Sequence, residues 1–233
     1  MTTEETDQNL PQEETPPKKK KSFFWRFVVF VFTLGLIGGI TGVGAVLWAF
    51  WEYGRDLPDY RQLAEYDPPV MTRVHAGNGA LLAEYATEKR VFVPVTEMPE
   101  PLIAAFLSSE DKNFYNHPGV DPVALMRAVA TNIVNYGTGR RPVGASTITQ
   151  QVAKNFLLTN EVSFTRKIKE AILAIRMELA FSKDQLLALY LNEIYLGMGS
   201  YGVAAAALNY FDKSLDTLTI AEMAYLAALP KAP

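Results

Sequence analysis

The chain contains no cysteine and only two histidines, His75 and His117, among its 233 residues. Without cysteine it forms no disulfide framework and no thiolate-bound metal site. Two histidines are too few to build a histidine-based metal centre on their own. The net charge is −3, so nucleic acid is not an expected partner. With 49% hydrophobic residues, the length suits one membrane anchor and one domain, not two large domains.

Charge is also missing from residues 27–51, an uninterrupted run of 25 uncharged residues. Such a run crosses a hydrocarbon core of about 30 Å as a helix. Trp48, Trp51 and Tyr53 at its end are typical of an aromatic interface belt and not of a cleavage site. The run therefore predicts a retained transmembrane helix.

Basic residues flank this run on its N-terminal side, at Lys18 to Lys21 and Arg26. The positive-inside rule then places the N-terminus in the cytoplasm and the rest of the chain outside, on the outer (periplasmic) face of the inner membrane. We expect four segments: a disordered cytoplasmic tail over 1–22, the anchor over 23–53, a juxtamembrane and small β region over 54–97, and a mainly α domain over 98–233.

Local patterns in the outward part predict a short β element followed by helices. Apolar runs at 70–75 and 80–85 flank the turn signal of residues 77–79, which indicates a hairpin, and 90–95 is a candidate third strand. Helix starts are expected at Asp121, Thr147, Ser182 and Thr219. The segment 136–144, with three glycines and the Arg140-Arg141 pair, suits a mobile loop over a cleft. Further along the chain, the apolar stripe of a helix is expected to face the core. It consists of Ile168, Ile172, Ile175 and Leu179.

Several polar residues in the second half have a chemical and a purely structural interpretation. Glu110 follows the apolar run 102–107, so it is either a general base in a cleft wall or an ordinary helix-end carboxylate. Lys154 lies beyond a helix N-terminus that attracts anions, although a capped helix needs no phosphate. Arg166 and Glu170, four residues apart, suit a simple ion pair. From 110 to 183 there are ten basic and six acidic residues, which fits either a solvated surface or a pyrophosphate site.

Five ordered blocks add to these observations, at residues 110–119, 144–155, 166–170, 190–202 and 221–233. The first opens with Glu110-Asp111 and ends in His117-Pro118-Gly119. In this order they resemble the five signature motifs of the peptidoglycan glycosyltransferases, glycosyltransferase family 51. Class A, bifunctional penicillin-binding proteins share this domain with monofunctional enzymes. The likeness runs from about residue 81 to residue 233.

The resemblance implies a mainly α, lysozyme-like helical glycosyltransferase domain with a small N-terminal β element, preceded by one transmembrane helix. It implies that Glu110 is the base for the acceptor sugar 4-hydroxyl and that Glu170 assists the departing pyrophosphate, directly or through Mg²⁺ or Mn²⁺. By the same resemblance, the residues that bind or position substrate are Asp111, Phe114, His117, Thr147, Gln151, Lys154, Asn155, Arg166, Lys167 and Asn192. Among these, His117 and Phe114 are expected to position the first motif.

The implied activity is the polymerisation of lipid II into β-1,4 glycan strands with release of polyprenyl pyrophosphate. The implied partners are lipid II, the growing glycan strand, the cell membrane and cell-wall assembly proteins. A transpeptidase domain is expected to follow the fifth motif in a longer parent protein. Two alternatives remain open at this point: a lysozyme-like peptidoglycan hydrolase or lytic enzyme, and a noncatalytic membrane-anchored scaffold.

Overall fold

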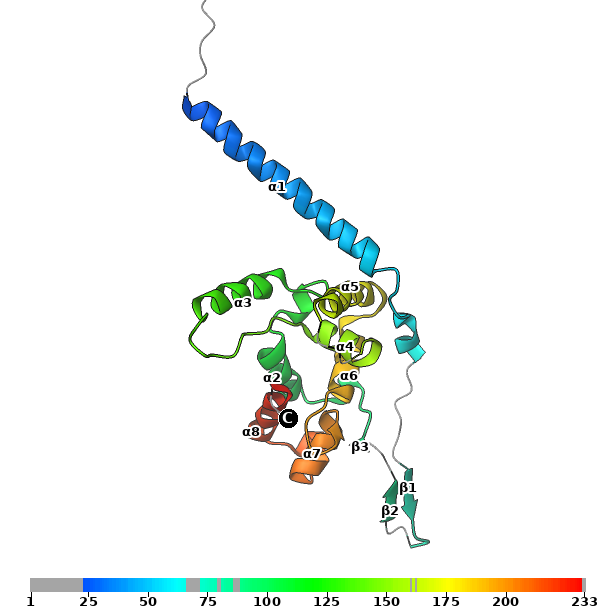
Figure 1. Ribbon diagram of the computed structural model, residues 1–233. Coiled ribbons are helices and arrows are strands. Elements are labelled where there is room, and N and C mark those ends of the chain that lie inside the picture. The colour runs from blue at the N-terminus through cyan, green and yellow to red at the C-terminus, as the bar shows by residue number, and fades with distance from the viewer. Residues whose placement is uncertain are drawn as a thin grey trace, which may run out of the picture. The chain divides into compact units, whose positions relative to one another are not determined.

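A computed structural model describes residues 23–65, 72–78, 81–85, 89–159, 161 and 163–231 (Figure 1). The expected tail over 1–22 lies outside these residues. The chain divides into two compact units, residues 1–48 and 49–233.

The described part of the first unit is most of the long helix α1, Phe23–Tyr53. This helix has 31 residues, none of them buried, and its most apolar stretch has a mean hydropathy of 2.1. At about 1.5 Å per residue it exceeds the thickness of a hydrocarbon core. Among the described residues, it is the one helix long and apolar enough to cross a membrane. The inside-to-outside direction remains a prediction.

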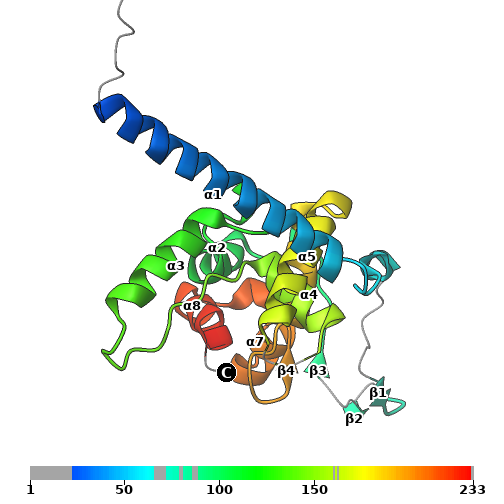
Figure 2. The same ribbon diagram turned by 45° about the horizontal axis from the view of Figure 1, so that its top comes forward.

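The second unit is built almost entirely of helices, which confirms the mainly α fold class (Figures 1 and 2). Its α-helices are α2 (Glu100–Glu110), α3 (Pro122–Val134), α4 (Ile148–Leu157), α5 (Phe164–Ala180), α6 (Lys183–Glu193), α7 (Val203–Phe211) and α8 (Ile220–Ala228). Short 3-10 turns lie at Tyr60–Glu65, Val95–Glu97, Phe114–Asn116, Leu215–Thr217 and Leu229–Lys231.

The helix starts expected from the sequence are confirmed. Thr147, Ser182 and Thr219 each form a complete capping box with the side chain three residues later. Asp121 accepts hydrogen bonds from the backbone N–H groups of Val123 and Ala124 at the start of α3. These caps satisfy backbone donors that have no partner within the first turn.

The core forms where α4 packs against α5 and α6, and where α2 packs against α8. Its largest fully buried side chains are Leu102, Phe106, Phe114, Ile148, Ile172, Leu173, Met177, Leu186, Leu187, Tyr190, Leu191 and Leu196. The juxtamembrane chain joins this core, because Leu63 is buried and Leu57 and Tyr60 pack against it.

The strands are short and form two separate pairs. β1 (Thr72–His75) and β2 (Leu81–Tyr85) are antiparallel, which confirms the hairpin. The third strand expected over residues 90–95 is wrong beyond Arg90, because β3 covers only Lys89–Arg90 and pairs in parallel with β4 (Ser200–Tyr201). Past Arg90 the backbone of Val93 is hydrogen-bonded at both N–H and C=O by the Asn192 side chain, at 2.8 Å each. That side chain takes the place of a neighbouring strand.

The inward face of α5 also differs from the expected stripe. Leu179 is 85% exposed, and Ile168 and Ile175 are only half-buried. The buried side chains of the helix are Glu170, Ile172, Leu173, Ala174 and Met177. Ile172 of the expected stripe is buried, but Glu170 holds a position of the inward row where an apolar residue would normally lie, so the apolar pattern indicated the buried face only in part.

Candidate active site

Glu110 ends α2 on the same side of the helix as two core residues. Leu102 and Phe106 precede it at four-residue steps, and both are fully buried. This spacing places the three side chains above one another on the inner face of the helix. Glu110 Oε2 accepts a hydrogen bond of 2.9 Å from Gln151 Nε2 of α4. Glu110 Oε1 is buried and has no hydrogen-bond partner among the described residues.

The carboxylates Glu110 and Glu170 line one cavity of about 710 Å³, sixty positions apart in the chain. This cavity also gathers five basic side chains against the two acidic ones: Arg141, Lys154, Arg166, Lys167 and Lys231. Its remaining wall includes Gln151 and residues 142–144 of the segment expected to form a loop over a cleft. The arrangement places the Glu110 carboxylate, which can accept a proton, beside an excess of positive charge. That excess of positive charge suits a dianionic phosphate group.

Glu170 is held tightly by its own helix. Its side chain is 1% exposed and forms ion pairs with Arg166 and Lys167, one turn earlier in α5. Lys167 Nζ also donates a 2.7 Å hydrogen bond to Ser146 Oγ, in the segment before α4. Two cations therefore compensate this buried carboxylate, which would otherwise be costly to desolvate.

The donor groups in the site do not by themselves form a metal centre. Among the described residues, no three His, Asp or Glu side chains gather where they could hold an ion. The Glu170 oxygens that a divalent cation would need are occupied by Arg166 and Lys167. The expected Mg²⁺ or Mn²⁺ at Glu170 remains a prediction.

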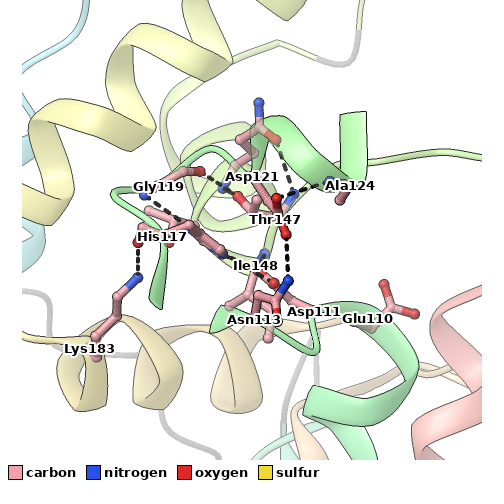
Figure 3. Close-up of polar contacts among 12 residues, drawn as sticks. Glu110, Asp111, Asn113, His117, Gly119, Asp121, Ala124, Thr147, Ile148 and Lys183 are labelled. Carbon is pink, nitrogen blue, oxygen red and sulfur yellow. Dashed lines mark hydrogen bonds and ion pairs between the residues drawn. The ribbon is translucent and has the colours of Figure 1, made fainter. Parts of the chain in front are cut away.

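Behind Glu110, the first motif is fixed by a buried pair, His117 and Asp111 (Figure 3). The Gly119 N–H donates to His117 Nδ1 at 3.1 Å, so this nitrogen carries no proton. The proton is on Nε2, which donates to Asp111 Oδ2 at 2.9 Å. Asp111 Oδ2 also accepts from the Ile148 N–H, at 3.0 Å, the first residue of α4. Asp111 thus ties the end of α2 to the start of α4, close to the Gln151 side chain that holds Glu110.

Thr147 and Asp121 extend the same network (Figure 3). Thr147 Oγ1 donates to Gly119 O at 2.6 Å and is buried. Asp121 Oδ2 accepts from Asn113 Nδ2 at 3.1 Å. The backbone hydrogen bond from Ala124, followed by the one from Asn113, holds the pKa of Asp121 below its usual value. Figure 3 shows the Glu110 side chain directed away from this cluster. The network therefore holds the end of α2 in place without using the Glu110 carboxylate as a hydrogen-bond partner.

The loop of the first motif is also pressed against α5 and α6. Gly119 has a φ of +92°, and a Cβ there would lie 2.7 Å from the backbone C and O of Ala174. Lys183 Nζ donates to His117 O and to Glu178 Oε1, at 2.7 Å each, and lies 4.5 Å from the centre of the Phe114 ring. Glycine and this lysine permit the close approach of loop and helix.

The other predicted site residues have different surroundings. Phe114 and Asn192 are buried, and Asn192 is fully engaged with the backbone near Val93. Asn155 is exposed and lies outside the cavity wall. Arg141 and Lys231 line the cavity but were not among the predicted site residues. The Arg140-Arg141 pair in a glycine-rich segment and the lysine of the fifth block were the available signals.

Comparison with known proteins identifies the family. A family model described as transglycosylase matches residues 78–233. The chain belongs to this family. The match confirms the resemblance to glycosyltransferase family 51 seen in the five blocks.

Named relatives are similar over most of this chain. Penicillin-binding protein 1A of Rickettsia conorii is 56% identical over 213 residues, which are 91% of this chain and 26% of that protein. Penicillin-binding protein 1A of Escherichia coli K12 is 41% identical over 208 residues, 89% of this chain and 24% of that protein. The chain thus spans about a quarter of the length of these relatives. A crystal structure of penicillin-binding protein 1A from Haemophilus influenzae covers 72% of this chain and 15% of its own, with 27% identity and a TM-score of 0.34, too low to bear on the fold.

Proposed function

We propose that this chain is a peptidoglycan glycosyltransferase that polymerises lipid II into β-1,4 glycan strands and releases polyprenyl pyrophosphate. The observation that carries the proposal is the single cavity lined by Glu110, Glu170 and five basic side chains. Membership of the transglycosylase family and the likeness to penicillin-binding proteins 1A support it.

Glu110 is the proposed general base. One of its oxygens is oriented by Gln151, and the other is buried at the cavity wall with no hydrogen-bond partner among the described side chains. It takes the proton of the acceptor sugar 4-hydroxyl while that oxygen attacks the anomeric carbon of the donor. Because the nucleophile is a sugar hydroxyl that arrives with the substrate, one base suffices, and such help contributes about 10²–10⁴-fold to the rate.

The basic side chains act on the other bond of the same step. As the new C–O bond forms, the bond between the anomeric carbon and the pyrophosphate oxygen breaks, and the configuration changes from α to β in one displacement. Lys154, Arg166 and Lys167 are the proposed groups that stabilise the developing negative charge. Glu170 holds the last two in place through its ion pairs.

The long helix α1 suits a substrate that resides in a membrane. Its length and apolar composition would keep the second unit at the bilayer surface, where a polyprenyl-linked sugar is found. The basic residues before it favour a cytoplasmic N-terminus and a catalytic domain on the outer face of the inner membrane. The lipid substrate, the glycan strand, the membrane and cell-wall assembly proteins are the proposed partners.

A polymerisation assay with purified protein and lipid II tests the proposal. The wild type should convert lipid II to long glycan, and Glu110→Gln should reduce the rate by about 10²–10⁴-fold at an unchanged melting temperature. Glu100→Gln is a matched control, because Glu100 lies exposed at the start of the same helix. It should retain wild-type activity.

The two alternative functions give different results in the same assay. Shortening of preformed glycan, with no product longer than the starting strand, would establish a hydrolase or lytic enzyme. Full polymerisation activity in Glu110→Gln would show that Glu110 is not the general base. No turnover of either substrate by the wild type would favour the scaffold.

A further inference from the structure

Three buried polar atoms have no hydrogen-bond partner within the described part of the chain: Arg166 Nε on α5, Glu110 Oε1 on α2 and Tyr190 Oη on α6. The last two belong to side chains on either side of the Phe106 ring's contact with Tyr190. Tyr190 is 1% exposed, so its hydroxyl has no access to bulk water. Buried hydroxyl and carboxylate groups in proteins are nearly always hydrogen-bonded, because leaving them unsatisfied is unfavourable. Two such atoms on neighbouring elements therefore indicate a shared interaction.

The packing brings these two side chains toward one another. The Phe106 ring meets the Tyr190 ring edge to face, with centroids 6.3 Å apart and planes at 76°. Phe106 precedes Glu110 by one helical turn, so the two side chains of α2 lie on the same face. Burial, followed by the negative charges of Glu110 and Asp111, raises the pKa of the Tyr190 phenol. The phenol therefore stays protonated, and its hydroxyl lies within the field of the two carboxylates.

The chemistry allows one direction for a hydrogen bond between these groups. An ionised carboxylate has no proton to donate, whereas a protonated phenol has one. Since Gln151 Nε2 already donates to Glu110 Oε2, a donor at Oε1 would complete the orientation of both oxygens. Each oxygen keeps a second lone pair, so the carboxylate remains able to accept the proton of an incoming hydroxyl.

We propose that Tyr190 is a positioning residue for Glu110, its hydroxyl donating a hydrogen bond, directly or through one water, to Glu110 Oε1 in the reacting enzyme. This inference rests on the proposed function, because it assigns a role to a group that acts through the general base. A hydrogen bond donated to a carboxylate stabilises the ionised form, which is the form that accepts a proton. Losing it should move the acid limb of the pH–rate profile to higher pH.

Other charged groups also lie near Glu110. They are Asp111 beside it, Lys154 of α4, the ion-paired cluster of Arg166, Lys167 and Glu170 on α5, and Arg141 and Lys231 of the cavity wall. A Tyr→Phe substitution at 190 leaves all of them in place. A shift of the acid limb between wild type and this variant therefore reports the hydroxyl alone.

The test compares Tyr190→Phe with Tyr210→Phe in the 233-residue protein assayed with lipid II over a range of pH. Tyr210 is the matched control, because its hydroxyl is satisfied by Leu196 O at 2.8 Å and lies outside the cavity. Tyr190→Phe should move the acid limb upward by about 0.5 to 1 pH unit and lower kcat by about three- to tenfold, with KM for lipid II unchanged. Tyr210→Phe should leave the limb in place. An unmoved limb in Tyr190→Phe, whether or not its rate or melting temperature falls, overturns the inference.

A second measurement does not depend on activity. With 3-fluorotyrosine at position 190, which keeps the shape of the side chain, the ¹⁹F resonance should titrate with pH in the wild-type background and stop doing so in Glu110→Gln. A resonance that titrates identically in both backgrounds overturns the proposed contact. If the ¹⁹F result holds while the wild type makes no glycan, the proposed function fails and the contact between Tyr190 and Glu110 stands.

Discussion

Lys154 differs from Arg166 and Lys167 in the same cavity because no carboxylate is paired with it among the described ion pairs, whereas those two are bound to Glu170. Its charge is therefore available to a phosphate. We expect Lys154→Ala to lower kcat/KM for lipid II by at least about tenfold, since a charge-assisted hydrogen bond is lost. The melting temperature should change by no more than about 2 °C, because a half-exposed lysine contributes little to folding.

The control for this change is Lys169→Ala, which removes a lysine of α5 that does not line the cavity. Its activity should stay close to that of the wild type. Equal losses of activity in the two variants would show that the cavity responds to overall charge and not to Lys154 itself.

Asp121 gives a pH-dependent prediction. Its pKa is lowered by the hydrogen bonds it accepts from Ala124, Asn113 and Val123, so its ionised form stabilises the folded state. This contribution is fully present above the pKa of the unfolded chain and is lost as the pH falls through the lower folded value. Asp121→Asn keeps the capping geometry without the charge. We expect wild type to be more stable than Asp121→Asn by roughly 0.5–1 kcal/mol at pH 7, with the difference disappearing near pH 3.

Urea unfolding at pH 7, 5 and 3 measures this difference. Asp216→Asn is a suitable control, because it lies in the 3-10 turn Leu215–Thr217 and caps no α-helix. A stability difference that stays constant across the three pH values would contradict the assigned cause.

At the scale of elements, the ion pair of Lys183 and Glu178 joins α6 to α5 and also holds the loop of the first motif. Lys183 is 20% exposed at its side chain and Glu178 is 7% exposed. Lys183→Met removes donors to Glu178 and to His117 O while keeping an apolar stem against Phe114. We expect a loss of about 1–3 kcal/mol in unfolding free energy, because among the described side chains Glu178 then keeps only the hydrogen bond from Thr149.

The same substitution at Lys213 is the comparison, because Lys213 and Glu222 form a more exposed pair near α8. Lys213→Met should cost less stability and leave activity unchanged. Lys183→Met should also lower kcat, since the His117 loop supports the end of α2. An intact kcat in a destabilised Lys183→Met would separate this loop from catalysis.

The elements were predictable where one residue determines the outcome and less so where several compete. Thr147, Ser182 and Thr219 each carry the partner of their capping box three residues later, so local chemistry was enough. The buried face of α5 was predicted only in part because Glu170 lies in it, with its charge compensated by Arg166 and Lys167. Apolar periodicity does not detect such a compensated carboxylate. The prediction of a strand after Arg90 was wrong for a similar reason. The backbone there is hydrogen-bonded by the side chain of Asn192, far along the chain.

The residues of the candidate site were likewise predictable only in part. Glu110 and Glu170 were predicted from the five blocks, and the structure places both on one cavity. Tyr190 lies in the fourth block but was not among the predicted site residues, because the position of its hydroxyl follows from packing against Phe106. Side chains that act through a neighbour are set by tertiary contacts, and these have no local sequence pattern.

At the scale of the whole molecule, the two units have separate tasks. Residues 49–233 contain the cavity and the core, whereas the described part of 1–48 is an apolar helix with no buried residue. Folding of the second unit should therefore not require the first. We expect the first unit instead to raise the local concentration of the protein at a membrane, which would increase binding without any new contact at the active site.

Removal of residues 1–48 tests this division. The shortened protein should melt within about 3 °C of the full chain and should polymerise detergent-dispersed lipid II at a comparable rate, because its cavity is unchanged. On lipid II embedded in vesicles its rate should fall by about ten- to hundredfold, the expected loss when membrane tethering is removed. Replacing residues 23–48 by an unrelated leucine-rich helix of equal length should restore the vesicle rate if anchoring is the whole contribution. Failure of that replacement, with normal membrane insertion, would show that the sequence of α1, including its glycines at 35, 38, 39 and 42, has a task beyond anchoring.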